Sequence, residues 1–237
     1  MNRKRKYQLI LVILIAIVIF NCAIIIHSMM TEVHNNSYNT TTIASNVNGT
    51  VYKIEAGNMS SNETVGLIIG VHPREHEIHE CINNTIHNLT QQTGNDTLSK
   101  KFVIYYIKTN DNLTTRTDTR AAGEELANKY VVPKIVKDKP FIVVDVHEIS
   151  PYYEYSNFVF SLSQKNDKLD SYISKICEDV DLVEFNFTEG TSPEKVTKPI
   201  AKKGVNTLLV ETYMDDNIDQ KNKTALKLIR CLDELQA

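Results

Sequence analysis

The fold of this chain is most constrained by nearly continuous apolar runs that alternate with helical patterns. Three of these runs are Gly66–Val71, Phe141–Val146 and Leu208–Val210. Strands with so few polar positions are typical of a parallel sheet, because helices then cover both of its faces. The sequence therefore predicts an α/β domain with a central mixed, mainly parallel sheet and helices on both faces.

The expected elements follow from apolar periodicity and from cap, proline and glycine signals. The predicted strands are 51–56, 65–71, 102–108, 141–147, 158–162, 182–187 and 207–212. The predicted helices are 77–92, 121–130, 167–179, 192–204 and 219–235. The lysine-rich stretch 134–139 is expected to be a solvated loop.

The N-terminus differs in character from the rest. A basic cluster, Arg3–Lys6, precedes an apolar run, Leu9–Ile26, and no Lys or Arg follows between His27 and Val51. This pattern predicts a transmembrane signal anchor through residues 7–27, with the N-terminus in the cytoplasm. A cleaved signal peptide is the alternative. Residues 1–30 would then be the basic tip and anchor, 31–48 a flexible Asn/Thr-rich stalk, and 49–237 an extracellular domain.

Glycan acceptor sequons support export, because N-x-Ser/Thr occurs more often than the composition predicts by chance. The sequons begin at Asn35, Asn39, Asn48, Asn58, Asn62, Asn83, Asn88, Asn95, Asn112, Asn186 and Asn222.

The net charge of −3 gives no reason to expect nucleic acid as a partner. Outside the apolar run, the odd number of cysteines argues against a full disulfide framework, while one pair, such as Cys177 with Cys231, stays open.

Three of the predicted strands end in residues that can bind a metal. His72 and Glu75 follow the first strand, His147 ends the second, and Glu211 ends the third. The carboxyl ends of parallel strands share one edge of a sheet, where ligands bind. Two histidines and a carboxylate are typical ligands of catalytic zinc, and a separate carboxylate can serve as general base. We therefore predict a Zn²⁺ site held by His72, Glu75 and His147, with Glu211 as the general base. Asp145 is predicted to accept a hydrogen bond from one of the metal ligands and so to hold it in place.

These segments resemble those of the zinc carboxypeptidases. Gly70–Glu75 is similar to their G-x-H-x-R-E motif, Asp145–His147 to their second-histidine strand, and Gly204–Glu211 to the strand that ends in their catalytic glutamate. The related succinylglutamate desuccinylase and aspartoacylase branch shares the order H-x-x-E…H…E. The resemblance covers roughly residues 65–212. It implies zinc, the ligand and base roles given above, and a substrate-binding role for Arg74.

The chain departs from that family between Glu75 and His147. The interval is short, and no Asn is followed directly by Arg there, although the family places an Asn-Arg pair in this region to bind the substrate carboxylate. Arg116 or Arg120 could stabilise an oxyanion or bind a carboxylate, with Asn112 as a further substrate contact. A requirement for a free C-terminal carboxylate is therefore open.

Residues 72–76 also match H-x-x-E-H, the inverted zincin motif, but Pro73 disfavours the continuous helix that this motif requires.

The leading hypothesis is a membrane-anchored extracellular zinc hydrolase of amide bonds, acting on a peptide or acyl-amino-acid substrate. The alternatives are a catalytically inactive metal- or substrate-binding surface protein of the same fold, and a structural cell-surface module.

Overall fold

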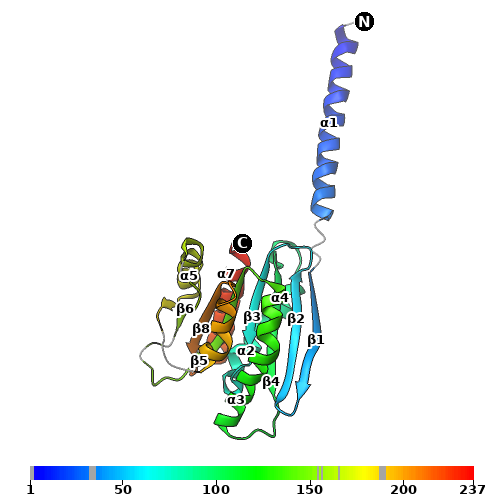
Figure 1. The fold of residues 1–237 in the computed structure, drawn as a ribbon. Coiled ribbons are helices and arrows are strands. Elements are labelled where there is room, and N and C mark those ends of the chain that lie inside the picture. Colours follow the sequence, from blue (N-terminus) through cyan, green and yellow to red (C-terminus); the bar gives the residue numbers. More distant parts are fainter. Residues whose placement is uncertain (1–2, 32–35, 154, 156, 165, 187–190) are drawn as a thin grey trace. The chain divides into compact units, whose positions relative to one another are not determined.

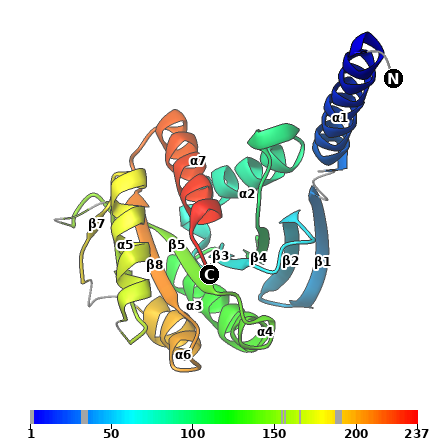
Figure 2. The same ribbon diagram turned by 90° about the horizontal axis from the view of Figure 1, so that it is seen from above.

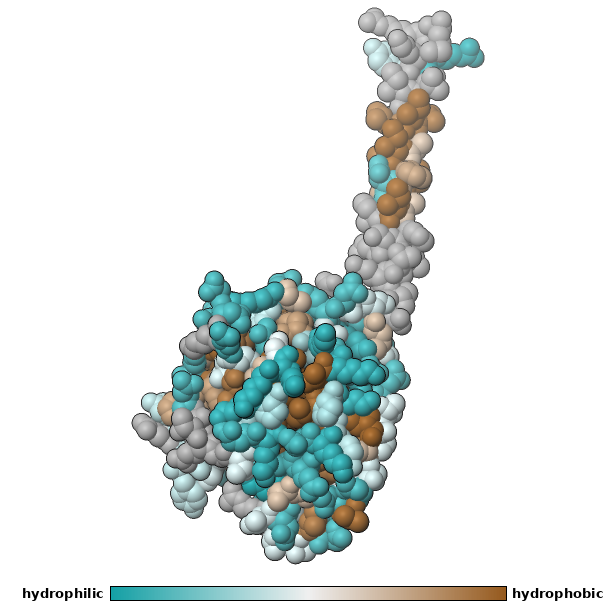
Figure 3. Space-filling view, in the orientation of Figure 1, coloured by the Kyte–Doolittle hydropathy of each residue, from teal (hydrophilic) through white to brown (hydrophobic). Residues whose placement is uncertain are grey.

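The computed structural model describes residues 3–31, 36–153, 155, 157–164, 166–186 and 191–237. The chain divides into two compact units, Met1–His34 and Asn35–Ala237. In the first unit, α1 (Arg3–Thr31) is a single helix, and Figure 3 shows hydrophobic residues along it. Ile19 and Phe20 are among its exposed apolar side chains. Among the described residues, no helix has both the length and the apolar character needed to cross a bilayer. The predicted anchor is therefore not supported by the structure.

The second unit is a mixed α/β domain, as predicted (Figure 1). Its sheet has the order β1-β2-β4-β3-β5-β8-β6-β7. The strands are β1 (Asn36–Asn46), β2 (Gly49–Asn58), β3 (Thr64–Ile69), β4 (Lys101–Thr109), β5 (Ile142–Ile149), β6 (Phe158–Ser161), β7 (Val183–Glu184) and β8 (Thr207–Tyr213). The central strands β4, β3, β5 and β8 are parallel to one another. β2 pairs antiparallel with β4, β1 pairs antiparallel with β2, and β6 pairs antiparallel with β8.

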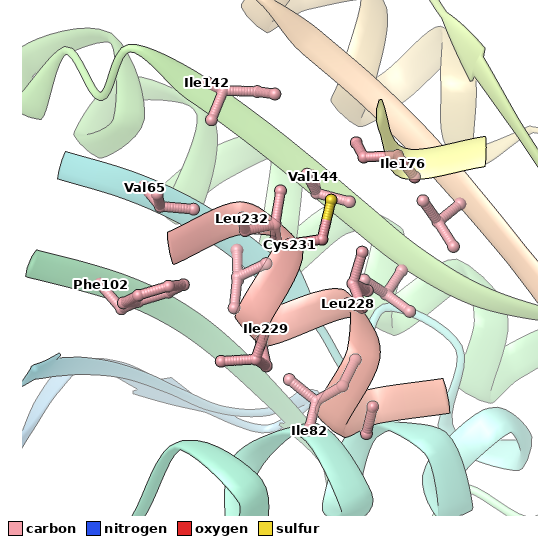
Figure 4. Close-up of a cluster of buried hydrophobic side chains, with 14 of the residues drawn as sticks. Val65, Ile82, Phe102, Ile142, Val144, Ile176, Leu228, Ile229, Cys231 and Leu232 are labelled. Carbon is pink, nitrogen blue, oxygen red and sulfur yellow. The ribbon is translucent and has the colours of Figure 1, made fainter. Parts of the chain in front are cut away.

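Helices cover both faces of the sheet, as predicted. They are α2 (His76–Thr90), α3 (Arg116–Leu126), α4 (Val132–Asp138), α5 (Asp167–Val180), α6 (Lys198–Ala201) and α7 (Ile218–Glu234), with shorter helical turns η1 (Pro73–Glu75), η2 (Gly94–Asp96), η3 (Ala127–Val131) and η4 (Pro193–Thr197). Figure 2 shows α2, α5 and α7 on one face, and α3, α4 and α6 on the other. The two larger apolar cores lie on opposite sides of the sheet, and a third, smaller cluster includes Phe158 and Phe160. In the first core, Leu228, Ile229 and Leu232 of α7 pack towards the strands (Figure 4).

The predicted stalk is wrong for residues 36–46, which form β1 and pair with β2 along its length. The run Thr40–Thr42 is β-branched, and such residues favour extended backbone. The side chains of this edge strand are mostly polar and exposed or half-buried. The sequence therefore shows no apolar alternation there that would have indicated a strand. Residues 32–35 of the predicted stalk lie outside the described part.

Two further expectations are corrected. Most of the stretch 134–139, predicted as a solvated loop, belongs to α4, because Ile135 is fully buried while the lysines beside it are exposed. Cys81, Cys177 and Cys231 are all free thiols, so the open pairing of Cys177 with Cys231 is not formed. Phe187, the last residue of the predicted strand 182–187, lies outside the described residues.

Candidate metal centre

A sharp turn after β3 places the first histidine. Gly70 has φ +83°, and a Cβ there would lie 2.0 Å from the carbonyl oxygen of Ile107, so only glycine fits. The chain then enters η1, in which the amide of Glu75 donates to the carbonyl of His72 at 3.0 Å. His72 and Glu75 are both buried and face the carboxyl edge of the sheet.

The second histidine comes from the adjacent strand. His147 lies near the end of β5, and in the parallel pairing of β5 with β8 its partner is Glu211. Parallel pairing places both residues at the same edge as the end of β3. The sheet therefore gathers residues that are up to 139 positions apart in the sequence, from His72 to Glu211.

The three predicted ligands converge on one point. Nδ1 of His72 lies 2.9 Å from Oε1 of Glu75, and Nδ1 of His147 lies 2.8 Å from Oε2 of the same carboxylate. One ligand atom from each of these residues lies within 4.8 Å of the others. All three side chains are buried, and a group of this composition and spacing can hold a metal ion.

Each imidazole also has a buried carboxylate on its other side. Oδ1 of Asp145 lies 3.1 Å from Nε2 of His147, and the Thr197 hydroxyl donates to Oδ2 of Asp145 at 2.9 Å. Oε1 of Glu124 lies 3.3 Å from Nε2 of His72. Histidines that bind metals commonly have such an outer partner, which fixes the ring orientation. Asp145 thus lies where the sequence predicted an outer acceptor.

Glu124 was not predicted from the sequence. It lies on α3 and is almost fully buried, with Lys195 2.7 Å from Oε2 and a hydrogen bond from the Thr191 hydroxyl to Oε1. Burial alone would raise the pKa of this carboxyl, but hydrogen bonds from His72, Lys195 and Thr191 outweigh burial and lower it to about 2. An acidic residue on a predicted helix was the only signal, and it could not distinguish Glu124 from its exposed neighbour Glu125.

The charges within the site are strongly interdependent. Burial would raise the pKa of Glu75, yet the imidazoles of His147 and His72 hold it well below its usual range. Burial disfavours the charged form of His147, but Asp145 and Glu75 outweigh it and raise the pKa of that imidazole. Burial, with the nearby charges of Glu75 and Asp145, raises the pKa of Glu211 to about 8 although His147 opposes this. Oε2 of Glu211 is buried and has no hydrogen-bond partner among the described residues.

A pocket of about 130 Å³ opens next to this centre. Its lining residues are His72, Pro73, Arg74, Glu75, Thr119, Arg120, Ser150 and Met214. Arg74 is exposed, and Arg120 is half-buried with Nε 3.4 Å from Oε1 of Glu124. Two arginines therefore line the pocket together with His72 and Glu75, two of the predicted metal ligands.

Not every predicted site residue reaches this pocket. Asn112 is exposed in the turn before α3 and is not a lining residue, and Glu211 does not line the pocket either. Arg116 begins α3, but its side chain is outside the described part. His76, which the inverted zincin motif would require as a ligand, is exposed at the start of α2 and does not belong to the group of three ligands.

Solved structures with the same fold identify the architecture. A metallo-carboxypeptidase from Burkholderia cenocepacia superposes with a TM-score of 0.60 at 14% identity, over 87% of this chain and 66% of that one. The fold is that of the metallo-carboxypeptidases. A metallo-carboxypeptidase from Pseudomonas aeruginosa, in complex with (2-guanidinoethylmercapto)succinic acid, matches at 0.53 and 11% identity, over 89% of this chain and 67% of that one.

An aspartoacylase family protein from Mesorhizobium loti matches at 0.49 and 12% identity, over 83% of this chain and 68% of that one. The chain spans about two thirds of the length of the two metallo-carboxypeptidases. No protein-family model matches the chain, and no curated protein matches it.

Proposed function

We propose that the chain is a zinc-dependent, carboxypeptidase-like hydrolase of amide bonds, acting on a peptide or acyl-amino-acid substrate. One observation carries the proposal. The Nδ1 atoms of His72 and His147 meet at the Glu75 carboxylate, while their Nε2 atoms face the buried carboxylates of Glu124 and Asp145.

The donor set fits zinc. Two imidazoles and one carboxylate are the ligands of many catalytic zinc sites, and the outer carboxylates are the partners that such histidines commonly have. His72, Glu75 and His147 would hold the ion. When bound, zinc supplies Lewis acidity that activates water and polarises the scissile carbonyl.

The side chains around the site would perform the remaining steps. Glu211 is the general base, which accepts the proton of the attacking water and transfers it to the leaving amine. Glu211 lies opposite His147 in the pairing of β5 with β8, at the same edge of the sheet as the ligands. Arg120 is placed by Glu124 to stabilise negative charge in the pocket, and Arg74 contacts the substrate at its rim. Arg116 and Asn112 are further candidates for these polar contacts.

The test begins with the metal content of the purified chain, expected to be one zinc ion per molecule. Glu211→Gln should retain zinc and lower kcat by about 100-fold or more, because general-base catalysis contributes on that order. The exposed Glu178→Gln of α5 is a control that should keep full activity. A Glu211→Gln protein with wild-type turnover would falsify the base assignment.

A catalytically inactive binding protein of the same fold is the second candidate. It is favoured by the position of Asn112 outside the pocket and by the missing Asn-Arg pair. A zinc-loaded wild-type chain that hydrolyses no member of a broad panel of peptides and acyl-amino acids would support it.

We further propose that the domain acts outside the cell. This proposal rests on the sequons, and the asparagines of several of them are exposed, including Asn39, Asn62, Asn88 and Asn222. Protein isolated from its native source should lose mass on deglycosylation. A mass equal to that of the bare polypeptide would contradict this location.

A further inference from the structure

A buried lysine lies behind the metal centre. The Lys221 side chain of α7 is only 2% exposed, and its ammonium lies 2.7 Å from Oε1 of Glu148 and 2.6 Å from Oε2 of Glu77. The same ammonium donates to the carbonyl of Met214 at 2.8 Å. An ammonium has three hydrogens, and here three oxygens lie around it.

Each of these oxygens belongs to a segment next to a site residue. Glu148 directly follows His147, and its backbone amide donates to Oε2 of Glu75 at 3.3 Å. Glu77 lies two residues after Glu75, at the start of α2. Met214 directly follows β8, its amide donates to the carbonyl of Ile149 at 3.1 Å, and it lines the pocket beside the centre.

Stability alone does not explain a charge in this position. Burying a lysine and a glutamate costs desolvation energy, and well-packed apolar residues usually stabilise a fold as well or better. A buried ion pair does fix the relative positions of the segments that it joins. Here the joined segments are those that carry Glu75, His147 and the Met214 wall of the pocket.

We propose that Lys221 is a positioning residue, which holds Glu75 and His147 in ligand geometry and fixes the pocket wall at Met214. This inference rests on the proposed function, because it assigns Lys221 a role in the same metal site. Lys221 itself touches neither the ligands nor the pocket, so it acts through Glu148, Glu77 and the Met214 carbonyl.

The test compares Lys221→Met with the double variant Lys221→Met/Glu148→Gln. The single variant leaves the buried carboxylate of Glu148 without its cation and should lose stability. The double variant has no buried charge there, and the remaining Glu77 carboxylate is half-exposed, so it should regain most of that stability. In the double variant we expect the zinc dissociation constant, measured by chelator competition, to rise about 3- to 10-fold. This is less than the cost of losing a direct outer partner of a ligand, about 10- to 100-fold, because Lys221 acts through other residues. The KM for substrate should rise as well, since the Met214 wall is released.

Two matched variants separate positioning from folding. Lys227→Met removes another lysine of α7, which pairs with Asp181 at the surface, and should leave zinc affinity and KM unchanged. Glu77→Gln removes only the negative charge of the half-exposed acceptor and keeps the buried pair of Lys221 with Glu148 intact, so it tests the same contact in a stable chain. It should raise the zinc dissociation constant or KM measurably.

The outcomes are distinct. If the wild-type chain binds no zinc, the proposed function fails and this inference fails with it. If the wild-type chain binds zinc while both the double variant and Glu77→Gln bind it equally well, with unchanged KM, only the role of Lys221 is overturned.

Discussion

At the scale of single residues, the position of Glu124 is the least expected feature of the site. Its carboxylate lies against Nε2 of His72 and also contacts Arg120, Thr191 and Lys195. The acid therefore orients the imidazole and, at the same time, the guanidinium in the pocket. A substitution of Glu124 should therefore disturb the metal centre, although Glu124 is not itself a metal ligand.

We expect Glu124→Gln to weaken zinc binding by about 10- to 100-fold, the usual cost of losing an outer partner of a metal ligand. The reason is that an amide cannot match the charged hydrogen bonds from His72 and Lys195. Chelator competition measures the affinity. Glu125→Gln is the matched control, because that neighbouring glutamate is exposed and bonds to Asn48 instead. Equal zinc affinity in the two variants would contradict the role of Glu124.

At the scale of elements, the approach of α3 to the end of β3 depends on one glycine. A Cβ on Gly123 would lie 1.9 Å from the carbonyl oxygen of Val71. Gly123→Ala should therefore push α3 away from the turn that carries His72, and displace Arg120 and Glu124 with it. We expect a loss of about 1–3 kcal/mol in the free energy of unfolding, typical of overpacking, together with reduced activity.

Urea denaturation and turnover assays measure these two effects. Ala121→Ser on the exposed side of the same helix is the control and should behave like wild type. Unchanged stability and activity in Gly123→Ala would show that α3 can shift without consequence for the site.

The link between α4 and the sheet should depend on pH. Asp138 lies 2.8 Å from the ammonium of Lys53 on β2 and accepts a hydrogen bond from the buried Tyr105 hydroxyl of β4 at 2.6 Å. Burial would raise the pKa of Asp138, but these two partners lower it below its ordinary value of 3.8. A lowered pKa means that the stabilisation is present above the ordinary value and is lost as the pH falls through the folded value.

Asp138→Asn should therefore cost about 1.5–3 kcal/mol at pH 7, the range for a hydrogen bond to a charged group. The difference from wild type should shrink as the pH falls below about 4, where Asp138 of the unfolded chain begins to be protonated, and should disappear once the pH is below the lowered pKa of the folded state. Urea titrations at a series of pH values measure it. Asp181→Asn, whose carboxylate is 76% exposed, should show no comparable dependence. A difference that stays constant down to pH 2 would contradict the assignment.

At the scale of the whole domain, metal binding and folding should be linked. The ligands come from the turn after β3, from η1 and from β5, and the proposed base comes from β8, so the site exists only when the sheet is assembled. A ligand that binds only the folded state stabilises it, by about 4 kcal/mol when its free concentration is a thousand times its dissociation constant. Removing zinc with a chelator should lower the melting temperature, and adding zinc back should restore it. His72→Ala/His147→Ala should show no such response to zinc.

The sequence by itself determined the α/β class, the two-sided cover of the sheet and the strand ends that bear His72, His147 and Glu211. These features follow from local periodicity and from the rule that parallel strands share one carboxyl edge. Only the tertiary structure revealed Glu124 and Lys221 beside the site, and the pairing of residues 36–46 with β2. A helical glutamate, a helical lysine and a polar edge strand have no distinctive local pattern. Their roles depend on which distant segment lies opposite them, and packing between elements decides that.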